Sequence, residues 1–252
     1  MKPIRSLASK WLFCFFLLVF YPPGHVKAQF TADLETGLVF TGRNDVRIPG
    51  TGGTFISFSD ELESDPDLFL RVRLGYRFNP RHEILALYAP LTVAYKGAID
   101  RDVIFQGETY EPGKPLSASY RFNSYRATYR YFLVVREKLA FALGPTIKIR
   151  DARIGLSQDR MASDKPDLGA VPLLHFHLHW KPARSLGVLL EGDALAAPQG
   201  RAEDVLLGLT CEMRENITLK AGYRILEGGA DNASVFTFSL FHYGLVGVHV
   251  SF

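Results

Sequence analysis

Three histidines at alternate positions are the residues in this sequence best spaced to bind a metal ion. His175, His177 and His179 are expected on one face of a strand, because side chains two residues apart on a strand share a face. Two histidines in this spacing can hold zinc with a third ligand from a neighbouring strand, and the register we expect places Glu191 opposite His175. We favour the alternative, in which neutral imidazoles fill a polar interior and pair with Glu191 and Asp193. We therefore predict no metal and no cofactor.

Charged side chains form a second pattern, because they recur at every other position within apolar segments. Between residues 68 and 78, for example, Val72 and Leu74 alternate with Arg71 and Arg73. This two-residue period predicts β-strands, and helical spacing of apolar residues is hard to find anywhere. The period is seen in ten segments: 30–41, 68–78, 84–97, 124–133, 139–150, 168–180, 186–195, 205–213, 217–226 and 235–252.

The connections between these segments alternate in length. Short polar turns lie at 79–82, 134–138, 181–185 and 214–216, and longer polar loops lie at 42–66, 98–116, 151–167, 196–203 and 227–234. Such alternation is typical of an up-and-down meander with short turns at one end and long loops at the other. We therefore predict an all-β fold, an antiparallel up-and-down β-barrel of about ten strands within a range of about 8–12.

One face of each segment is almost free of charge, and aromatic residues lie near both of its ends. They are Phe78, Tyr131, Phe141, Trp180 and Phe252 at the short-turn end, and Phe40, Tyr95, Phe236 and Phe238 toward the loops. Two aromatic girdles mark the membrane interfaces of transmembrane barrels, whereas the apolar face of a soluble barrel points inward. We therefore predict a transmembrane β-barrel, with a soluble periplasmic β-protein as the alternative.

The chain ends on alternating residues, with Val246, Val248, Val250 and Phe252 on one face. This tail resembles the C-terminal signature of Gram-negative outer-membrane β-barrel proteins, and the strand pattern of 29–252 is similar to theirs. The resemblance implies a location in the cell outer membrane and contact with its lipids and lipopolysaccharide. It also implies that the outer-membrane assembly machinery recognises Val248, Val250 and Phe252. No specific subfamily is identified.

Alternate residues of each strand share a face, and we call the assignment of these faces to the inside or outside parity. Parity predicts a luminal charge network inside the barrel. One half of the wall is basic, with Arg71, Arg73, Arg77, Lys96, Arg126, Arg130, Lys148 and Arg150. The other half is mostly acidic, with Glu191, Asp193, Asp204, Glu212, Asp33 and Glu35, and with Glu227 at a strand end. Lys220 and Arg224 are the exceptions on that side.

Two functions are consistent with this charge layout. In a narrow barrel, long cationic side chains can reach across the lumen to the carboxylates, and buried charges are tolerated only when they are paired. If the interior is instead wet, the same layout is a transverse field through which ions or small polar solutes pass. The narrowness favours a filled barrel with a structural or surface-interaction role, and a narrow channel is the alternative.

Catalytic arrangements are less well supported by the sequence. His249 and Ser251 form an H-x-S spacing that resembles lipid A deacylase barrels, but the required Glu should follow downstream, and parity turns His249 inward. Omptin-type proteases also have ten strands, but they need a histidine beside acidic pairs at the outer rim. Here no rim histidine is placed to complete a site with the rim acids Asp193, Asp204, Glu227 and Asp231. We therefore predict that the protein is not an enzyme, and a membrane-embedded hydrolase is the least favoured alternative.

Residues 1–28 have the pattern of a secretory signal peptide, with a basic start, an apolar run at 11–21 and a small residue before Gln29. We predict that this segment is cleaved and that 29–252 forms the barrel domain. The remaining 25 Lys+Arg against 26 Asp+Glu give a net charge of −1, which provides no bulk attraction to nucleic acid. Cys211 is then the single cysteine, so an internal disulfide is excluded.

The long loops are the remaining candidates for function. Carboxylates gather near 192–193, 201–204 and 227–232, where they could hold a divalent cation or bridge one to lipopolysaccharide phosphates. We favour a solvated turn surface at these positions. Alternating residues at 54–59 and 103–110 predict short strand extensions beyond the membrane. No loop position identifies an extracellular ligand.

Overall fold

The computed structural model describes residues 29–197 and 200–252, and the segment predicted as a signal peptide lies outside these residues. The strands are β1 (Gln29–Arg47), β2 (Ile56–Ser57), β3 (Asp67–Asn79), β4 (His82–Ala89), β5 (Thr92–Ala98), β6 (Val103–Phe105), β7 (Glu108–Tyr110), β8 (Pro115–Arg136), β9 (Leu139–Gln158), β10 (Met161–Trp180), β11 (Leu186–Ala197), β12 (Gly200–Arg214), β13 (Ile217–Asp231) and β14 (Phe236–Ser251). Within the described ranges the one helix is α2 (Phe58–Glu61), and no helix there is long and apolar enough to cross a membrane.

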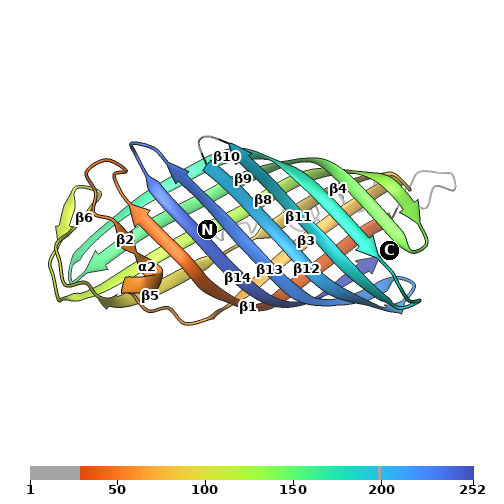
Figure 1. The fold of residues 1–252 in the computed structure, drawn as a ribbon, viewed down its shortest axis with the longest axis horizontal. Helices are drawn as coiled ribbons and strands as arrows, with labels where there is room; N and C mark the ends of the chain where they lie inside the picture. The colour runs from red at the N-terminus through yellow and green to blue at the C-terminus, as the bar shows by residue number, and fades with distance from the viewer. Residues whose placement is uncertain (1–28, 198–199) are drawn as a thin grey trace, which may run out of the picture.

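Ten strand positions close into a single antiparallel barrel (Figure 1). Each strand pairs with its neighbours along the chain, and β14 pairs back to β1 over most of its length. β4 and β5 occupy successive parts of one position, because both pair with β8 and Pro90 and Leu91 separate them. This confirms the predicted up-and-down β-barrel of about ten strands.

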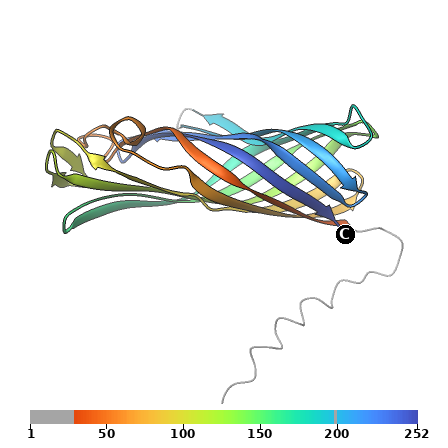
Figure 2. The same cartoon turned by 90° about the horizontal axis from the view of Figure 1, so that it is seen from below.

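The strands are longer at the loop end than the sequence pattern predicts. The predicted loop 151–167 is wrong, because β9 and β10 stay paired as far as Gln158 and Met161 and leave only Asp159 and Arg160 in the turn. Most of the predicted loops 196–203 and 227–234 likewise belongs to β11, β12 and β13. Two long connections remain, one with β2 and α2 and the other with the β6–β7 hairpin. Figure 2 shows this hairpin at the end opposite the C-terminus.

The polarity of the two barrel faces changes along the long strands. On β8 the inner face carries the buried Arg126 in its middle, but the buried Tyr120 and Leu116 toward the loop end. The outer face changes in the opposite sense, from the exposed Tyr125 to the exposed Ser117. We call this the polarity changeover. It explains the missed strand lengths, because a lipid-facing pattern ends there while backbone pairing continues.

A compact apolar core fills one side of the barrel above the charged interior. It joins the loop segments to the strands through fully buried side chains, including Ile48, Ile56, Phe58, Tyr95 and Phe105. The rings of Phe58 and Tyr95 lie 5.3 Å apart. The prediction that Tyr95 belongs to the outer aromatic girdle is therefore wrong, because β5 lies beyond the polarity changeover and its apolar face points inward.

Candidate functional site

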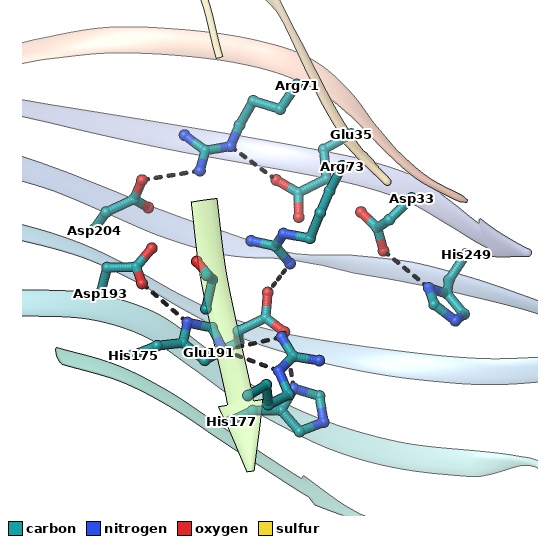
Figure 3. A network of polar contacts seen from close by, with 12 residues as sticks. Asp33, Glu35, Arg71, Arg73, His175, His177, Glu191, Asp193, Asp204 and His249 are labelled. Atoms are coloured by element: carbon teal, nitrogen blue, oxygen red, sulfur yellow. Dashed lines mark hydrogen bonds and ion pairs between the residues drawn. The ribbon is translucent and has the colours of Figure 1, made fainter. Parts of the chain in front are cut away.

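The candidate site is the charged interior in the middle of the barrel (Figure 3). Each strand directs alternate side chains inward, so charges far apart in the sequence meet across the lumen. We use the term luminal network for twelve ion-paired residues: Asp33, Glu35, Glu83, Glu191, Asp193, Asp204, Arg71, Arg73, Arg126, Arg130, Lys220 and Arg224. Most of them are almost completely buried.

Asp204 on β12 is the point at which three guanidinium groups meet. It accepts hydrogen bonds from Arg71 at 2.9 Å, from Arg126 at 2.6 Å and from Arg224 at 2.6 Å. Arg224 also donates to both carboxylate oxygens of Glu35 at 2.9 Å. Charge-assisted bonds of this kind are stronger and more directional than neutral ones. One carboxylate thereby ties β3, β8 and β13 to β12 across the interior.

Glu191 on β11 is the second centre of the network. It accepts hydrogen bonds from Arg130 and from Nδ1 of His177, both at 2.8 Å, and it also contacts Arg73. Arg130 in turn donates to Glu83 at 3.1 Å. These contacts link β3, β4 and β8 on one wall to β10 and β11 on the other.

The contacts of His175 define its protonation pattern. Arg130 donates to Nε2 of the imidazole from two nitrogens, at 3.1 and 3.0 Å, so Nε2 must carry a lone pair. The proton therefore sits on Nδ1, which donates to Asp193 at 3.0 Å. Asp193 also accepts from Arg126 at 2.6 Å and from Thr146 at 2.8 Å. His175 thus acts as a neutral connector inside the network.

The three alternating histidines do not converge on one point. His177 contacts Glu191, whereas His179 lies 2.8 Å from the hydroxyl of Thr210. The expected register is also wrong, because Glu191 pairs with His177, and Asp193 is the residue opposite His175. β10 and β11 begin their pairing at Trp180 and Val188, so the turn is longer than expected. Within residues 29–197 and 200–252, no group of three His, Cys, Asp or Glu side chains is arranged to hold a metal ion.

Other predicted luminal charges lie toward the ends of the lumen and pair locally. The pairs are Arg77 with Glu83 at 3.6 Å, Glu212 with Lys181 at 2.8 Å and Arg150 with Asp167. Glu227 pairs with Arg201 on the outer face, because the inward residues of β13 are Lys220, Arg224 and Leu226. His249 at the short-turn end lies 3.5 Å from Asp33, while Lys220 donates to Asp33 and Glu35. These contacts extend the pairing of charges over most of the barrel length.

Two residues show where parity reasoning fails. Lys96 was predicted to be luminal, but it is exposed on the outer face of β5. The reason is the polarity changeover, beyond which the outer face is the polar one. Glu83 was missed, because β4 begins at His82 and the predicted strand began one residue later than Glu83. Both faces of β4 are apolar, with Leu85 and Leu87 inside and Ile84 and Ala86 outside, so the parity that predicts an inward Lys96 would have turned Glu83 outward.

Aromatic side chains cover the luminal network toward the loop end. Phe69 and Tyr243 pack edge to face at 4.9 Å, and Phe241 and Tyr120 lie 5.6 Å apart. The cavity beside Phe69 and Tyr243 measures about 10 Å³, which is close to the minimum for one water molecule. Beside Phe69 and Tyr243, packed aromatic rings therefore lie directly on the loop-end side of the luminal network.

Comparison with known proteins shows the fold. No protein-family model and no curated protein matches the sequence. The structure is similar to the outer membrane protease OmpT of Escherichia coli, with a TM-score of 0.53 and 10% identity over 89% of this chain and 97% of that chain.

Two further solved structures are more distant. They are Neisserial surface protein A, with a TM-score of 0.36 and 16% identity over 88% of this chain and 97% of that chain, and the attachment invasion locus protein Ail of Yersinia pestis, with a TM-score of 0.36 and 11% identity over 88% and 98%. The chain thus has the fold of Gram-negative outer-membrane β-barrels. At these identities the likeness carries no information about activity.

Proposed function

We propose that this protein is an outer-membrane β-barrel with a closed interior, which acts at its loop end in a structural or surface-interaction role. The observation that supports this most strongly is the luminal network. Asp204 and Glu191 each engage cations from opposite walls, so ion pairs occupy the cross-section through which solutes would pass. Buried charges that are paired in this way are costly to separate, which opposes opening of the lumen.

The outer face supports the proposed location in the outer membrane. Leu74, Ile147 and Leu209 are exposed by 57%, 59% and 67%, in the middle part of their strands, where lipid would cover them. The C-terminal Phe252 is 75% exposed, so its ring is accessible to the assembly machinery that we expect to recognise this tail. We further propose export through the predicted signal peptide and contact with lipopolysaccharide on the loop side.

We propose a non-catalytic role for the barrel. His249 Nδ1 lies 3.5 Å from Asp33. The buried carboxylates at Asp193 and Asp204 are each held by arginines. These contacts engage the histidine and the buried carboxylates in structural pairs, which favours a non-catalytic role.

Single-channel recording tests the closed interior. Residues 29–252 would be refolded in lipid, shown to be folded by gel mobility before heating, and compared with a general porin as the positive control. We expect no discrete conductance steps. Steps that change in size for Arg126→Ala but not for Arg153→Ala, which is exposed at the loop end, would instead establish a channel and overturn the proposal.

The surface role has its own test in whole cells. Exchange of 100–114, which carries the β6–β7 hairpin, for a short Gly–Ser linker is expected to change adhesion of the cells to a test surface. The luminal variant Glu212→Gln should leave adhesion unchanged. Equal adhesion in all strains would contradict a role for this loop.

A further inference from the structure

A cavity of about 750 Å³ occupies the loop-end half of the barrel, beside the apolar core. Its lining comes from the inner faces of β8, β9 and β10 on one side and from β11, β12, β13 and β14 on the other. A volume of this size is in the range of small-molecule binding pockets. β10 pairs with β11 only between Leu174 and Trp180, so among the described residues the loop-end part of β10 has no partner strand on that side, and the pocket opens there as well as at the loop end.

The floor of this pocket holds a buried lysine side chain. Lys148 on β9 is 2% exposed, and its Nζ lies 4.5 Å from the centre of the Phe122 ring. Lys148 is opposite Arg126 in the β8–β9 ladder, but of these two cations only Arg126 contacts Asp193 and Asp204. Within the described part of the chain, Lys148 has no carboxylate in ion-pair contact. A buried lysine is costly to keep protonated without a counter-ion, so an anion bound at the pocket floor would stabilise its charged form.

The upper walls of the pocket carry the same sign of charge. Lys165 lines it together with Lys148, whereas Asp167 is the one acidic residue of the lining and is already contacted by Arg150. Arg201 is paired with Glu227 and lies over the ring of Phe238. Cations at the entrance and at the floor attract an anion and favour its retention.

The remaining lining is apolar and aromatic. The rings of Tyr120 and Phe122 are nearly parallel, with centroids 6.3 Å apart, and both line the pocket. Ile154, Val171 and Leu195 contribute aliphatic surface. An inorganic anion would satisfy the lysine but would leave this surface uncovered, so the lining favours an organic ligand.

We propose that this pocket binds a free small organic anion with an apolar or aromatic body, whose charged head pairs with Lys148. The inference rests on the proposed role of the loop end, for which it names a class of ligand. It does not depend on whether the lumen conducts. The luminal network below Lys148 forms the closed base of the pocket.

Isothermal titration calorimetry on refolded 29–252 tests the proposal with phenyl phosphate as the probe. Benzyl alcohol, which has a similar body without charge, and inorganic phosphate, which lacks the body, are the two comparison ligands. We expect phenyl phosphate to bind at least about ten times more tightly than either one, because only it matches both parts of the lining. Absence of phenyl phosphate binding at millimolar concentration would overturn the proposal.

Two variants and a matched control locate the site. Lys148→Met is expected to weaken phenyl phosphate binding at least about tenfold, whereas Lys138→Met, an exposed lysine in a turn at the other end, should leave it unchanged. If Lys148→Met does not fold by gel mobility, Ala152→Phe supplies the test, because its ring would occupy the pocket. Unchanged affinity in the folded pocket variant would refute the assignment.

A further titration identifies the source of the anion. Lipopolysaccharide also carries phosphates, so phenyl phosphate binding would be repeated with purified lipopolysaccharide added to the micelles. We expect unchanged affinity, because the aromatic body of a free ligand would pack against Tyr120 and Phe122. Competition would show that a lipid phosphate occupies the site and would contradict a free ligand. The binding results can be interpreted whether or not the barrel conducts in single-channel recordings, so failure of this proposal is distinguishable from failure of the proposed closed interior.

Discussion

Substitution of Asp204 by asparagine is the most direct perturbation of the luminal network. The change keeps the shape of the side chain but removes the charge on which Arg71, Arg126 and Arg224 converge. Asp204 is 2% exposed, so water cannot easily replace the lost anion. Loss of one partner of a buried ion pair costs about 3–5 kcal/mol, and we expect Asp204→Asn to reduce the free energy of unfolding by that amount. The folding equilibrium would then change by a factor of roughly 10²–10⁴.

The chain provides its own reporter for this measurement. Without residues 1–28, Trp180 is the one tryptophan in the sequence, and it is 52% exposed on the outer face near the short turns. Its fluorescence should change as the barrel leaves the lipid, so urea unfolding in lipid vesicles can be followed directly. Asp231→Asn, at an exposed position at the end of β13, is the matched control and should be close to neutral.

The outcome decides between a dry and a wet interior. Solvent-exposed ion pairs contribute only about 0–1 kcal/mol. A loss below about 1 kcal/mol for Asp204→Asn would mean that water screens the network, and it would refute the reasoning behind a closed lumen. A loss equal to that of Asp231→Asn would have the same meaning.

Three further predictions concern the strands and the loop end. Gly37→Ala should destabilise the barrel by about 1–3 kcal/mol in urea titrations, because Gly37 has φ +147° and its Cβ would lie 2.1 Å from the carbonyl oxygen of Gly244; Gly244→Ala meets nothing within 4 Å and should be nearly neutral. Leu74→Arg should cost about 2–4 kcal/mol in lipid vesicles, and a neutral effect would contradict a lipid-facing position. For Glu61 beside α2, burial raises the pKa of the carboxyl, but hydrogen bonds from Arg101 and from the backbone N–H at the start of the helix lower it below 4.5 overall. The contact should therefore contribute fully to the free energy of unfolding above pH 4.5, and this contribution should be lost as the pH falls through the lowered pKa of Glu61. An NMR titration that gives Glu61 a pKa above 4.5 would contradict this prediction.

The sequence carries most of the information needed to predict the barrel. Strict alternation over ten segments predicts the strand positions, and parity correctly turns residues such as Arg71 and Asp204 toward the interior. The pairing itself could not be predicted, because it depends on how far each strand is shifted against its neighbour. His175 is an example: Glu191 is its expected partner, but the turn is longer and the register is shifted by two residues, so His175 pairs with Asp193.

The wrongly assigned faces share one physical cause. Alternation shows that two faces differ, but it does not show which face is inside, and the answer differs between the membrane part and the loop end. Tyr95 and Lys96 were therefore both assigned to the wrong face. The pocket around Lys148 was missed for a related reason, because it is formed by strand ends that the pattern interprets as loops.

The polarity changeover has a consequence for how the barrel sits in a bilayer. A cylinder with a uniformly apolar exterior could slide along the membrane normal at little cost. Here the outer face of β8 changes from Tyr125 to Ser117, and that of β9 changes from Ile149 to the exposed Arg153. Two residues along a strand span about 7 Å, so a shift by one such pair would either immerse polar groups or leave apolar ones dry. The outer faces of these strands thus fix the position of the barrel along the membrane normal, and with it the position of the loop end and its pocket relative to the lipid.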